Sequence, residues 1–114
     1  MTHPVIHAEI RASDPDATRA FFSKLFDWKY SEGGLPGYTF VDSGDEGALA
    51  TAIGPTQGGP EAVLFFVRVQ DVEATLARAE ELGGKTVQPA QNVPGVTFGV
   101  LEDSQGHLIG VASN

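Results

Sequence analysis

The sequence contains no cysteine, which excludes disulfide bridges, thiolate nucleophiles and centres in which cysteine ligates zinc or an iron–sulfur cluster. Basic residues are scarce as well. Seven Lys and Arg against fifteen Asp and Glu give a net charge of -8, which disfavours binding to nucleic acid or to anionic membrane surfaces. No apolar run is long enough to span a membrane. Residues 1–4 show neither the basic region nor the apolar stretch of a signal peptide, so we expect a cytoplasmic location.

The residues that are present are typical of a globular protein. The 114 residues include 41% hydrophobic and 19% charged side chains, which is enough apolar material for one buried core. Two halves of such a chain would each be too short to fold well alone. We therefore expect a single domain over residues 1–114.

The N-terminal half shows a strand followed by a helix. Residues 5–12 alternate, which predicts a strand with His7, Glu9 and Arg11 on one face and apolar side chains on the other. Asp14 suits the N-cap of a helix, and apolar residues at helical spacing extend that helix from Pro15 to Phe26. Further strands are predicted over residues 38–42 and 48–53.

The same order of elements begins again in the C-terminal half. We predict a strand over residues 63–69, a helix that begins after Asp71 and ends at Gly83-Gly84, and a short extended piece at 86–87. Residues 88–95, with two prolines, are predicted to form a loop, and strands follow over 97–101 and 107–112. The shift that places Asp14 on Asp71 also places Arg11 on Arg68, which indicates two pseudo-repeat modules over about 1–57 and 58–114.

Several segments together resemble the vicinal-oxygen-chelate superfamily, which includes glyoxalases, bleomycin-resistance proteins and extradiol dioxygenases. They are His7-Ala8-Glu9-Ile10, Asp14-Pro15-Asp16-Ala17, Phe66 to Val72, and Asp103-Ser104-Gln105-Gly106-His107. The resemblance covers essentially the whole chain. It implies an α+β fold in which two βαβββ modules form a curved mixed sheet around a cup, with the helices outside. It also implies a homodimer and a small-molecule ligand.

The resemblance further implies a divalent metal held at inward-facing strand positions. The matching positions here are His7, Thr51, Leu64 (or Phe65 after a slip of one) and Gly110, where a metal enzyme would show Glu. Leu and Gly side chains cannot ligate a metal, and a threonine hydroxyl is a poor donor. Glu9 is the one possible substitute, because it shares a strand face with His7. We therefore expect no metal and no other cofactor.

The candidate catalytic pair is His7 with Glu9. A carboxylate beside an imidazole fixes its tautomer and makes a plausible acid or base. Two other interpretations stay open: His7 is a structural histidine or the remnant of a metal site, and Glu9 forms an ion pair with Arg11. Arg11 and Arg68 occupy equivalent positions, so they are candidates to face each other across the cup and to favour an anionic or carbonyl-bearing ligand.

The remaining candidate ligand-binding residues are mostly apolar: Thr51, Leu64, Phe66 and Gly110. A mostly apolar lining with a few polar groups is typical of a small-molecule pocket. Gly110 either leaves room for part of a ligand or permits close packing of the backbone.

Two classes of function fit these residues. The first is a metal-independent lyase or isomerase that moves a proton next to a carbonyl, with His7 as the base and Glu9 orienting it. The second is a non-catalytic protein that sequesters an antibiotic or carries a metabolite. A metal-dependent lyase or dioxygenase fits less well. The substitution His7→Ala separates the first two classes, because it should abolish turnover in the first and largely spare ligand affinity in the second.

Overall fold

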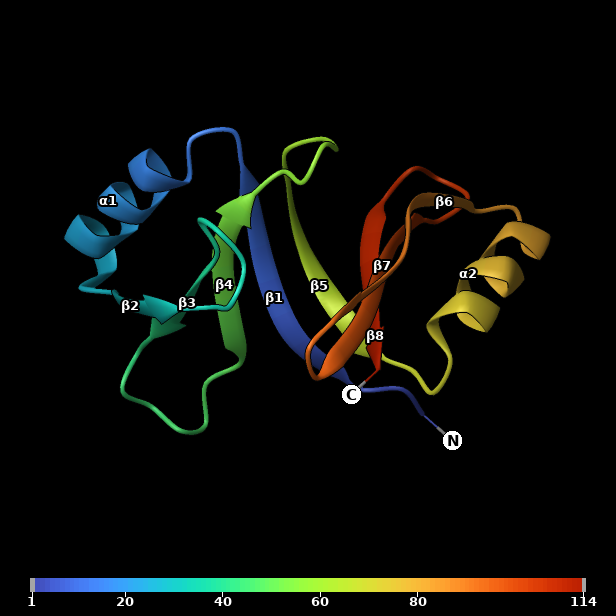
Figure 1. The fold of residues 1–114 in the computed structure, drawn as a ribbon, viewed down its shortest axis with the longest axis horizontal. Helices are drawn as coiled ribbons and strands as arrows, with labels where there is room; N and C mark the ends of the chain where they lie inside the picture. Colours follow the sequence, from blue (N-terminus) through green and yellow to red (C-terminus); the bar gives the residue numbers. More distant parts are fainter. Residues whose placement is uncertain (1, 114) are drawn as a thin grey trace. The chain divides into compact units, whose positions relative to one another are not determined.

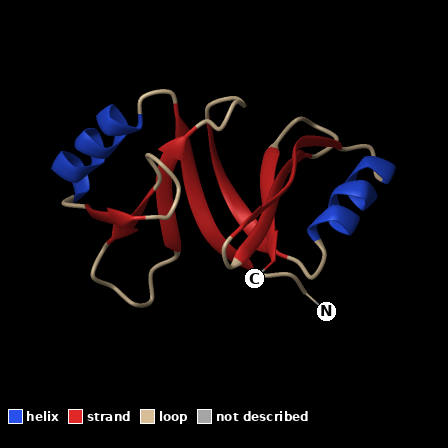
Figure 2. Cartoon of the chain, viewed as in Figure 1, coloured by secondary structure: helices blue, strands red, loops and turns tan. Residues whose placement is uncertain are grey.

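The computed structural model describes residues 2–113, which form two helices and eight strands (Figures 1 and 2). The chain divides into two compact units. One unit is residues 7–63, and the other comprises the described residues of 1–6 and 64–114. Both boundaries fall within strands, and each such strand is assigned whole to the module that contains most of it, the first module being the unit of residues 7–63. No helix within residues 2–113 is long and apolar enough to cross a membrane.

The first module has the order strand, helix, three strands. Its β4 strand pairs in parallel with β1 and antiparallel with β3, and β3 pairs antiparallel with β2, so the strand order is β2-β3-β4-β1. The elements are β1 (Val5–Ala12), α1 (Pro15–Phe26), β2 (Lys29–Glu32), β3 (Thr39–Asp42) and β4 (Ala50–Pro55).

The second module repeats this topology. Its β8 strand pairs in parallel with β5 and antiparallel with β7, and β7 pairs antiparallel with β6, so the order is β5-β8-β7-β6. The elements are β5 (Ala62–Arg68), α2 (Val72–Glu81), β6 (Lys85–Val93), β7 (Val96–Glu102) and β8 (Leu108–Ser113). The predicted α+β class with two βαβββ modules is confirmed.

Both helices begin where the sequence predicts. The Asp14 side chain accepts a hydrogen bond from the backbone N–H of Ala17 at 3.1 Å, and Asp71 does the same for Ala74 at 3.0 Å. These carboxylates satisfy backbone donors that have no partner within the helix, and they lie at its positive end.

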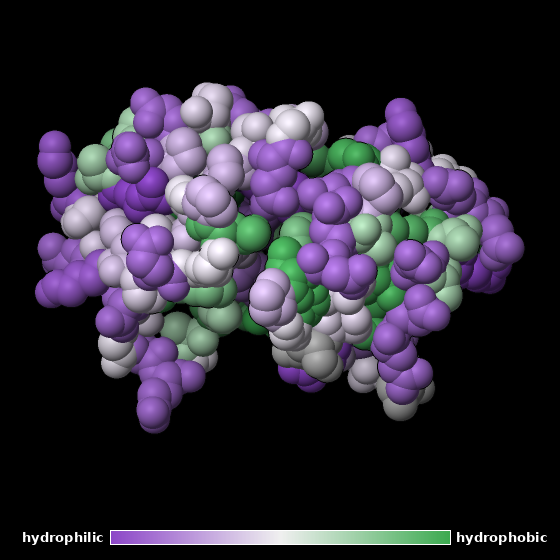
Figure 3. All heavy atoms as spheres, viewed as in Figure 1, coloured by the Kyte–Doolittle hydropathy of each residue, from purple (hydrophilic) through white to green (hydrophobic). Residues whose placement is uncertain are grey.

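The two helices differ in how they pack. Helix α2 buries Val72 and Leu76 against Val69 and Val111, whereas no residue of α1 is fully buried. Phe21, Leu25 and Phe26 of α1 are each more than half exposed. In Figure 3, hydrophilic and hydrophobic residues are mixed over the part of the surface where α1 lies.

One prediction about strands was wrong, and one strand was not predicted. Residues 88–95 do not form a loop, because β6 runs to Val93 and pairs with β7 with register shifts on either side of Gln88. Pro89 is accommodated because β6 is the edge strand of its module, where a missing N–H breaks no ladder. Strand β2, which follows α1 at Lys29, was not predicted.

Candidate functional site

The register of three strands in the first module brings one set of side chains to the same face. His7 pairs with Ala50, and Glu9 pairs with Ala52, which in turn pairs with Phe40 of β3. Paired residues of neighbouring strands project on the same side of a sheet. We call this side of the first module the His7 face. Its lining is polar on β1, small on β4, and aromatic at β3 and the residue directly before it: His7, Glu9, Arg11, Ala50, Ala52, Gly54, Phe40 and Tyr38.

Tyr38, which directly precedes β3, reaches across this face to β1. Its ring lies against Gly54, where an added Cβ would stand only 2.6 Å from Cδ2 of the ring. Because Gly54 has no side chain, the Tyr38 hydroxyl group reaches β1, where it donates to Glu9 Oε1 at 2.6 Å. The same hydroxyl oxygen lies 2.9 Å from His7 Nε2. Tyr38 thus joins two residues that the sequence analysis proposed as a pair.

Glu9 forms a buried ion pair with Arg11 of the same strand. The Arg11 Nε donates to Glu9 Oε2 at 2.5 Å, and the two residues are only 3% and 6% exposed. Burial raises the pKa of Glu9, but the neighbouring His7, the hydrogen bonds from Tyr38 and Arg11 and the charge of Arg11 outweigh it and hold this pKa below its usual 4.5. Glu9 is therefore an ionised hydrogen-bond acceptor at neutral pH.

Tyr38 keeps its proton. Burial, the negative charge of Glu9 and the hydrogen bond to it raise the pKa of Tyr38 far above its usual value of 10, and Arg11 lowers it only in part. The phenolic proton points to Glu9, so the phenol oxygen accepts a hydrogen bond from His7. The His7 Nε2 atom is therefore the donor in the contact with Tyr38.

An aromatic surface adjoins this network. The ring of Phe40 packs edge-on against His7, with ring centroids 6.0 Å apart, and edge-on against Tyr38 at 5.5 Å. Phe40 is 37% exposed, while the His7 side chain is 16% exposed. The imidazole therefore lies beside an apolar surface that solvent reaches.

Thr51 does not lie on the His7 face. It pairs with Ala8, which projects from the other side of β1, and its hydroxyl group donates to the Leu49 carbonyl oxygen at 3.0 Å. The prediction that Thr51 and His7 share a lining is thus corrected. The register places Ala50 and Ala52 beside His7 and Glu9 instead.

The second module brings Leu64, Phe66 and Gly110 together as an apolar group. Phe66 pairs with Gly110, and a Cβ added at Gly110 would stand 2.4 Å from two carbons of the Phe66 ring. Leu64 and Phe66 are 4% and 3% exposed. Of the two interpretations of Gly110, close packing holds, because Phe66 occupies the space that was considered for a ligand.

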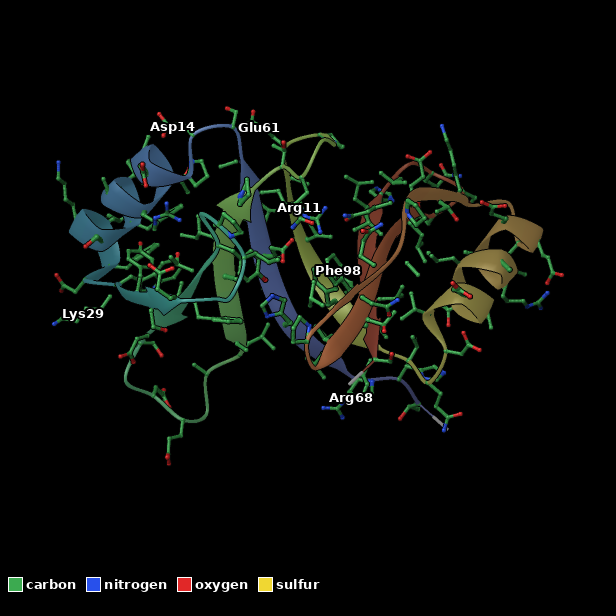
Figure 4. All side chains as sticks on the ribbon, in the orientation of Figure 1. Arg11, Asp14, Lys29, Glu61, Arg68 and Phe98 are labelled. Atoms are coloured by element: carbon green, nitrogen blue, oxygen red, sulfur yellow. The ribbon has the colours of Figure 1, made fainter. Side chains whose placement is uncertain are left out.

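The two arginines at equivalent positions differ in environment. Arg11 is buried in its pair with Glu9, whereas Arg68 is exposed and extends outward at the end of β5 (Figure 4). That Arg11 and Arg68 face each other stays a prediction.

The residues at the positions that the resemblance assigns to a metal do not fit a divalent cation. Both carboxylate oxygens of Glu9 hold hydrogen bonds, one from Arg11 and one from Tyr38. Leu64 and Gly110 offer no donor atom. Within residues 2–113, no three His, Asp or Glu side chains gather in a way that could hold a metal ion. We therefore derive no chemical step through a metal.

Sequence reasoning missed Tyr38. It placed this residue at the start of a predicted strand and gave it no part in the site. The available signal was the alternation that puts Tyr38 and Phe40 on one face, together with a glycine, Gly54, on a following strand. Joining these signals requires the register of β3 with β4, which the sequence does not state.

Comparisons with known proteins place the chain in a family. The family model described as Glyoxalase/Bleomycin resistance protein/Dioxygenase superfamily matches residues 5–111. A Mycobacterium bovis protein named "Putative glyoxylase CFP32" is 24% identical over 111 residues, which is 90% of this chain but only 42% of that protein. The chain thus spans less than half the length of the curated relatives it matches.

Solved structures share the fold. The protein BH1468 from Bacillus halodurans C-125 has a TM-score of 0.67 at 16% identity, with 100% of this chain and 96% of that one covered. A methylmalonyl-CoA epimerase variant from Streptomyces coelicolor, in complex with 2-nitronate-propionyl-CoA, has a TM-score of 0.58 at 20% identity, with the same coverage. On the family model and the shared fold, the chain belongs to the glyoxalase/bleomycin resistance protein/dioxygenase superfamily.

Proposed function

We propose that the first module binds a small molecule at the His7 face and moves a proton next to a carbonyl group of that molecule, without a metal ion. The observation that carries this proposal is the chain of hydrogen bonds from His7 through Tyr38 and Glu9 to Arg11. Glu9 orients His7 through Tyr38 rather than by a direct hydrogen bond, because His7 Nε2 is 3.6 Å from Glu9 Oε1. An imidazole fixed in one tautomer is suited to general acid–base work.

The proposed step needs no oxidant or reductant. A C–H bond next to the carbonyl breaks, its proton goes to His7 Nδ1, and its electron pair forms the enolate. The positive charge that develops on the imidazole is balanced by the ionised carboxylate of Glu9, which acts through the Tyr38 hydroxyl group. Exchange of the Nδ1 proton with solvent before its return to the same carbon gives isotope exchange. Protonation of the opposite face of that carbon gives epimerisation, and protonation of a neighbouring atom gives isomerisation. The structural neighbour named as an epimerase supports this class of reaction.

The same geometry favours an uncharged ligand with an apolar group. The charge of Arg11 is opposed by Glu9, and its side chain is only 6% exposed, so it is poorly placed to bind an anion. Phe40 offers an apolar surface directly beside the imidazole. Of the ligand types considered from sequence, we therefore propose a carbonyl compound rather than an anion.

The second candidate is a protein that binds a small molecule without turnover. The exposed Phe40 ring, held edge-on by His7 and Tyr38, is the observation that favours it. An aromatic surface of this kind holds an apolar ligand whether or not a proton moves.

Hydrogen–deuterium exchange in the ligand separates the two candidates. A panel of aliphatic ketones, aryl ketones and thioesters is incubated with the protein in D2O, and loss of the proton signal next to the carbonyl is followed by NMR. His7→Ala is the test variant, and His107→Ala, which alters an exposed histidine of the second module, is the matched control.

Exchange that needs His7 but not His107 supports the proton-transfer enzyme. A ligand that raises the melting temperature of both wild type and His7→Ala, without exchange, supports the binding protein. Neither exchange nor a thermal shift across the panel contradicts both candidates.

Two broader proposals accompany the function. We propose that the chain acts as a homodimer and that it works in the cytoplasm. Light scattering coupled to size-exclusion chromatography tests the first, and fractionation of the source cells tests the second. A mass of 12.0 kDa in solution would contradict the dimer.

A further inference from the structure

The Tyr38 hydroxyl group lies within hydrogen-bond distance of both candidate catalytic residues, His7 and Glu9. We propose that Tyr38 is a positioning residue: its hydroxyl group, held by Glu9, accepts a hydrogen bond from Nε2–H of His7 and so makes Nδ1 the basic nitrogen of the imidazole. The role of that nitrogen in proton transfer rests on the proposed function. The tautomer itself does not.

The direction of each hydrogen bond follows from the chemistry of the groups. A carboxylate carries no proton, so Tyr38 must donate to Glu9 across the 2.6 Å between Oη and Oε1. A phenol has one proton only, so the same oxygen can only accept from His7 across 2.9 Å. The proton in this second hydrogen bond therefore belongs to Nε2.

Arg11 keeps this direction from reversing. Its Nε donates to Oε2 of Glu9 and leaves Oε1 for Tyr38. A positively charged partner stabilises the ionised form of the carboxylate, which has no proton to offer. The burial of both side chains limits their rotamers, so the orientation passes from Arg11 along the chain to His7.

Packing alone would not require a hydroxyl group at this position. A phenylalanine would fill the same space above Gly54 and would keep the edge-on contact with Phe40. The variant Tyr38→Phe therefore removes the hydrogen bonds and retains the ring. Tyr30→Phe is the matched control, because it removes a hydroxyl group of the same module that donates to the Arg19 carbonyl oxygen at 2.8 Å.

The test is long-range proton–nitrogen NMR of the three histidines in uniformly ¹⁵N-labelled protein above pH 8. His107 serves as an internal reference of the opposite tautomer, because its Nδ1 lies 3.0 Å from Asp103 Oδ2 and donates to that carboxylate. His3, which is exposed, reports the tautomer mixture of an imidazole in solvent.

We expect wild-type His7 to show the Nε2–H tautomer, and His107 the Nδ1–H tautomer. In Tyr38→Phe the Nδ1–H population of His7 should rise several-fold towards the mixture shown by His3, and Tyr30→Phe should leave it unchanged. Gly54→Ala should act in the same direction as Tyr38→Phe, since its new Cβ displaces the ring while the hydroxyl group is retained.

The inference is overturned if wild-type His7 carries its proton on Nδ1, or if both Tyr38→Phe and Gly54→Ala leave the tautomer ratio unchanged. Failure of the proposed function looks different. In that case the tautomer responds as expected, but no carbonyl compound exchanges deuterium in the presence of wild-type protein. Slower exchange in Tyr38→Phe than in Tyr30→Phe, at similar ligand affinity, supports both together.

Discussion

The two modules differ in the side chains of their first strands. When the modules are aligned so that Asp14 matches Asp71, polar residues of β1 fall on apolar residues of β5. His7 and Glu9 of β1 correspond to Leu64 and Phe66 of β5. The polar pair enters a hydrogen-bonded network with Tyr38 and Arg11, while the apolar pair is buried, with Phe66 packed against Gly110. Hydrogen bonds are directional, and apolar contacts are not. The first module is therefore built to orient an imidazole, and the second to bury surface.

The helices repeat this difference. Arg19 of α1 corresponds to Leu76 of α2. Arg19 Nη1 donates to the Gly37 carbonyl oxygen at 3.1 Å and to Thr39 Oγ1 at 3.2 Å, which attaches α1 to β3. Leu76 is 5% exposed and belongs to the apolar cluster of its module. One helix is held by polar contacts of its own residues, and the other mainly by burial.

The largest effect should come from breaking the buried ion pair. Arg11→Met leaves Glu9 charged and buried with a smaller set of donors, and we expect a loss of about 3–5 kcal/mol in the free energy of unfolding. Urea denaturation at pH 7 measures it. Arg68→Met is the matched control, because Arg68 occupies the equivalent position of the second module but is exposed. It should change the free energy of unfolding by no more than about 0.5 kcal/mol.

The double variant Glu9→Leu/Arg11→Met tests the reason for this loss. It puts two apolar side chains in place of the buried ion pair, and such a replacement is often neutral. We expect it to recover most of the stability that Arg11→Met loses, and to lose the orientation of His7. A double variant as unstable as the single one would contradict this account.

The helix comparison gives the next effect. Leu76→Ala should destabilise the protein by about 2–5 kcal/mol, because it opens a cavity among buried side chains. Leu25→Ala alters a leucine of α1 that is 57% exposed, so it should stay within about 0.5 kcal/mol. Both are measured by urea denaturation. A large loss for Leu25→Ala would show that the exposed side of α1 is covered in solution.

The sequence was sufficient for the elements that depend on local signals. Alternation marked β1, the Asp14 cap and helical spacing marked α1, and the recurrence of both near Asp71 indicated the second module. Pro89 misled the prediction for β6, because a proline that breaks a central strand is tolerated at an edge.

The site was harder to predict, since it depends on register. A shift of one residue between β1 and β4 exchanges the two faces of a strand, and this difference moved Thr51 away from His7. The Tyr38 ring can reach Glu9 because Gly54, against which the ring lies, has no side chain. No pattern within a single strand contains that contact.

Overfilling the second module sharpens the comparison further. Gly110→Ala places a Cβ against the Phe66 ring, and we expect a loss of about 1–3 kcal/mol. Phe66→Leu should relieve part of this clash, so the double variant should be more stable than the sum of the two single losses predicts, by about 0.5–3 kcal/mol. Strict additivity in urea denaturation would mean that Phe66 does not occupy the space above Gly110.

The smallest effect concerns equivalent turns of the two modules and appears as a pH dependence. Asp103 accepts hydrogen bonds from the backbone N–H groups of His107 and Gln105 and from the ring of His107. The two bonds from His107 are the main cause that lowers the pKa of Asp103 from 3.8 to about 2. A carboxyl group with a lower pKa in the folded protein stabilises the fold above pH 3.8, and this contribution disappears as the pH falls towards 2. Asp103→Asn should therefore lower the urea midpoint at pH 7 and match wild type at pH 2.

The matched control is Asp45→Asn in the turn of the first module, where the carboxylate accepts one backbone hydrogen bond, from Gly47 at 2.9 Å. The Asp103 carboxylate also lies 3.0 Å from His107 Nδ1, through Oδ2. The substitution at Asp103 therefore removes more hydrogen bonds to a carboxylate than the one at Asp45. We expect the midpoint of Asp103→Asn to converge on wild type over this pH range and that of Asp45→Asn to differ less throughout. A gap for Asp103→Asn that persists unchanged at pH 2 would show that its loss comes from the shape of the turn rather than from the charge of the carboxylate.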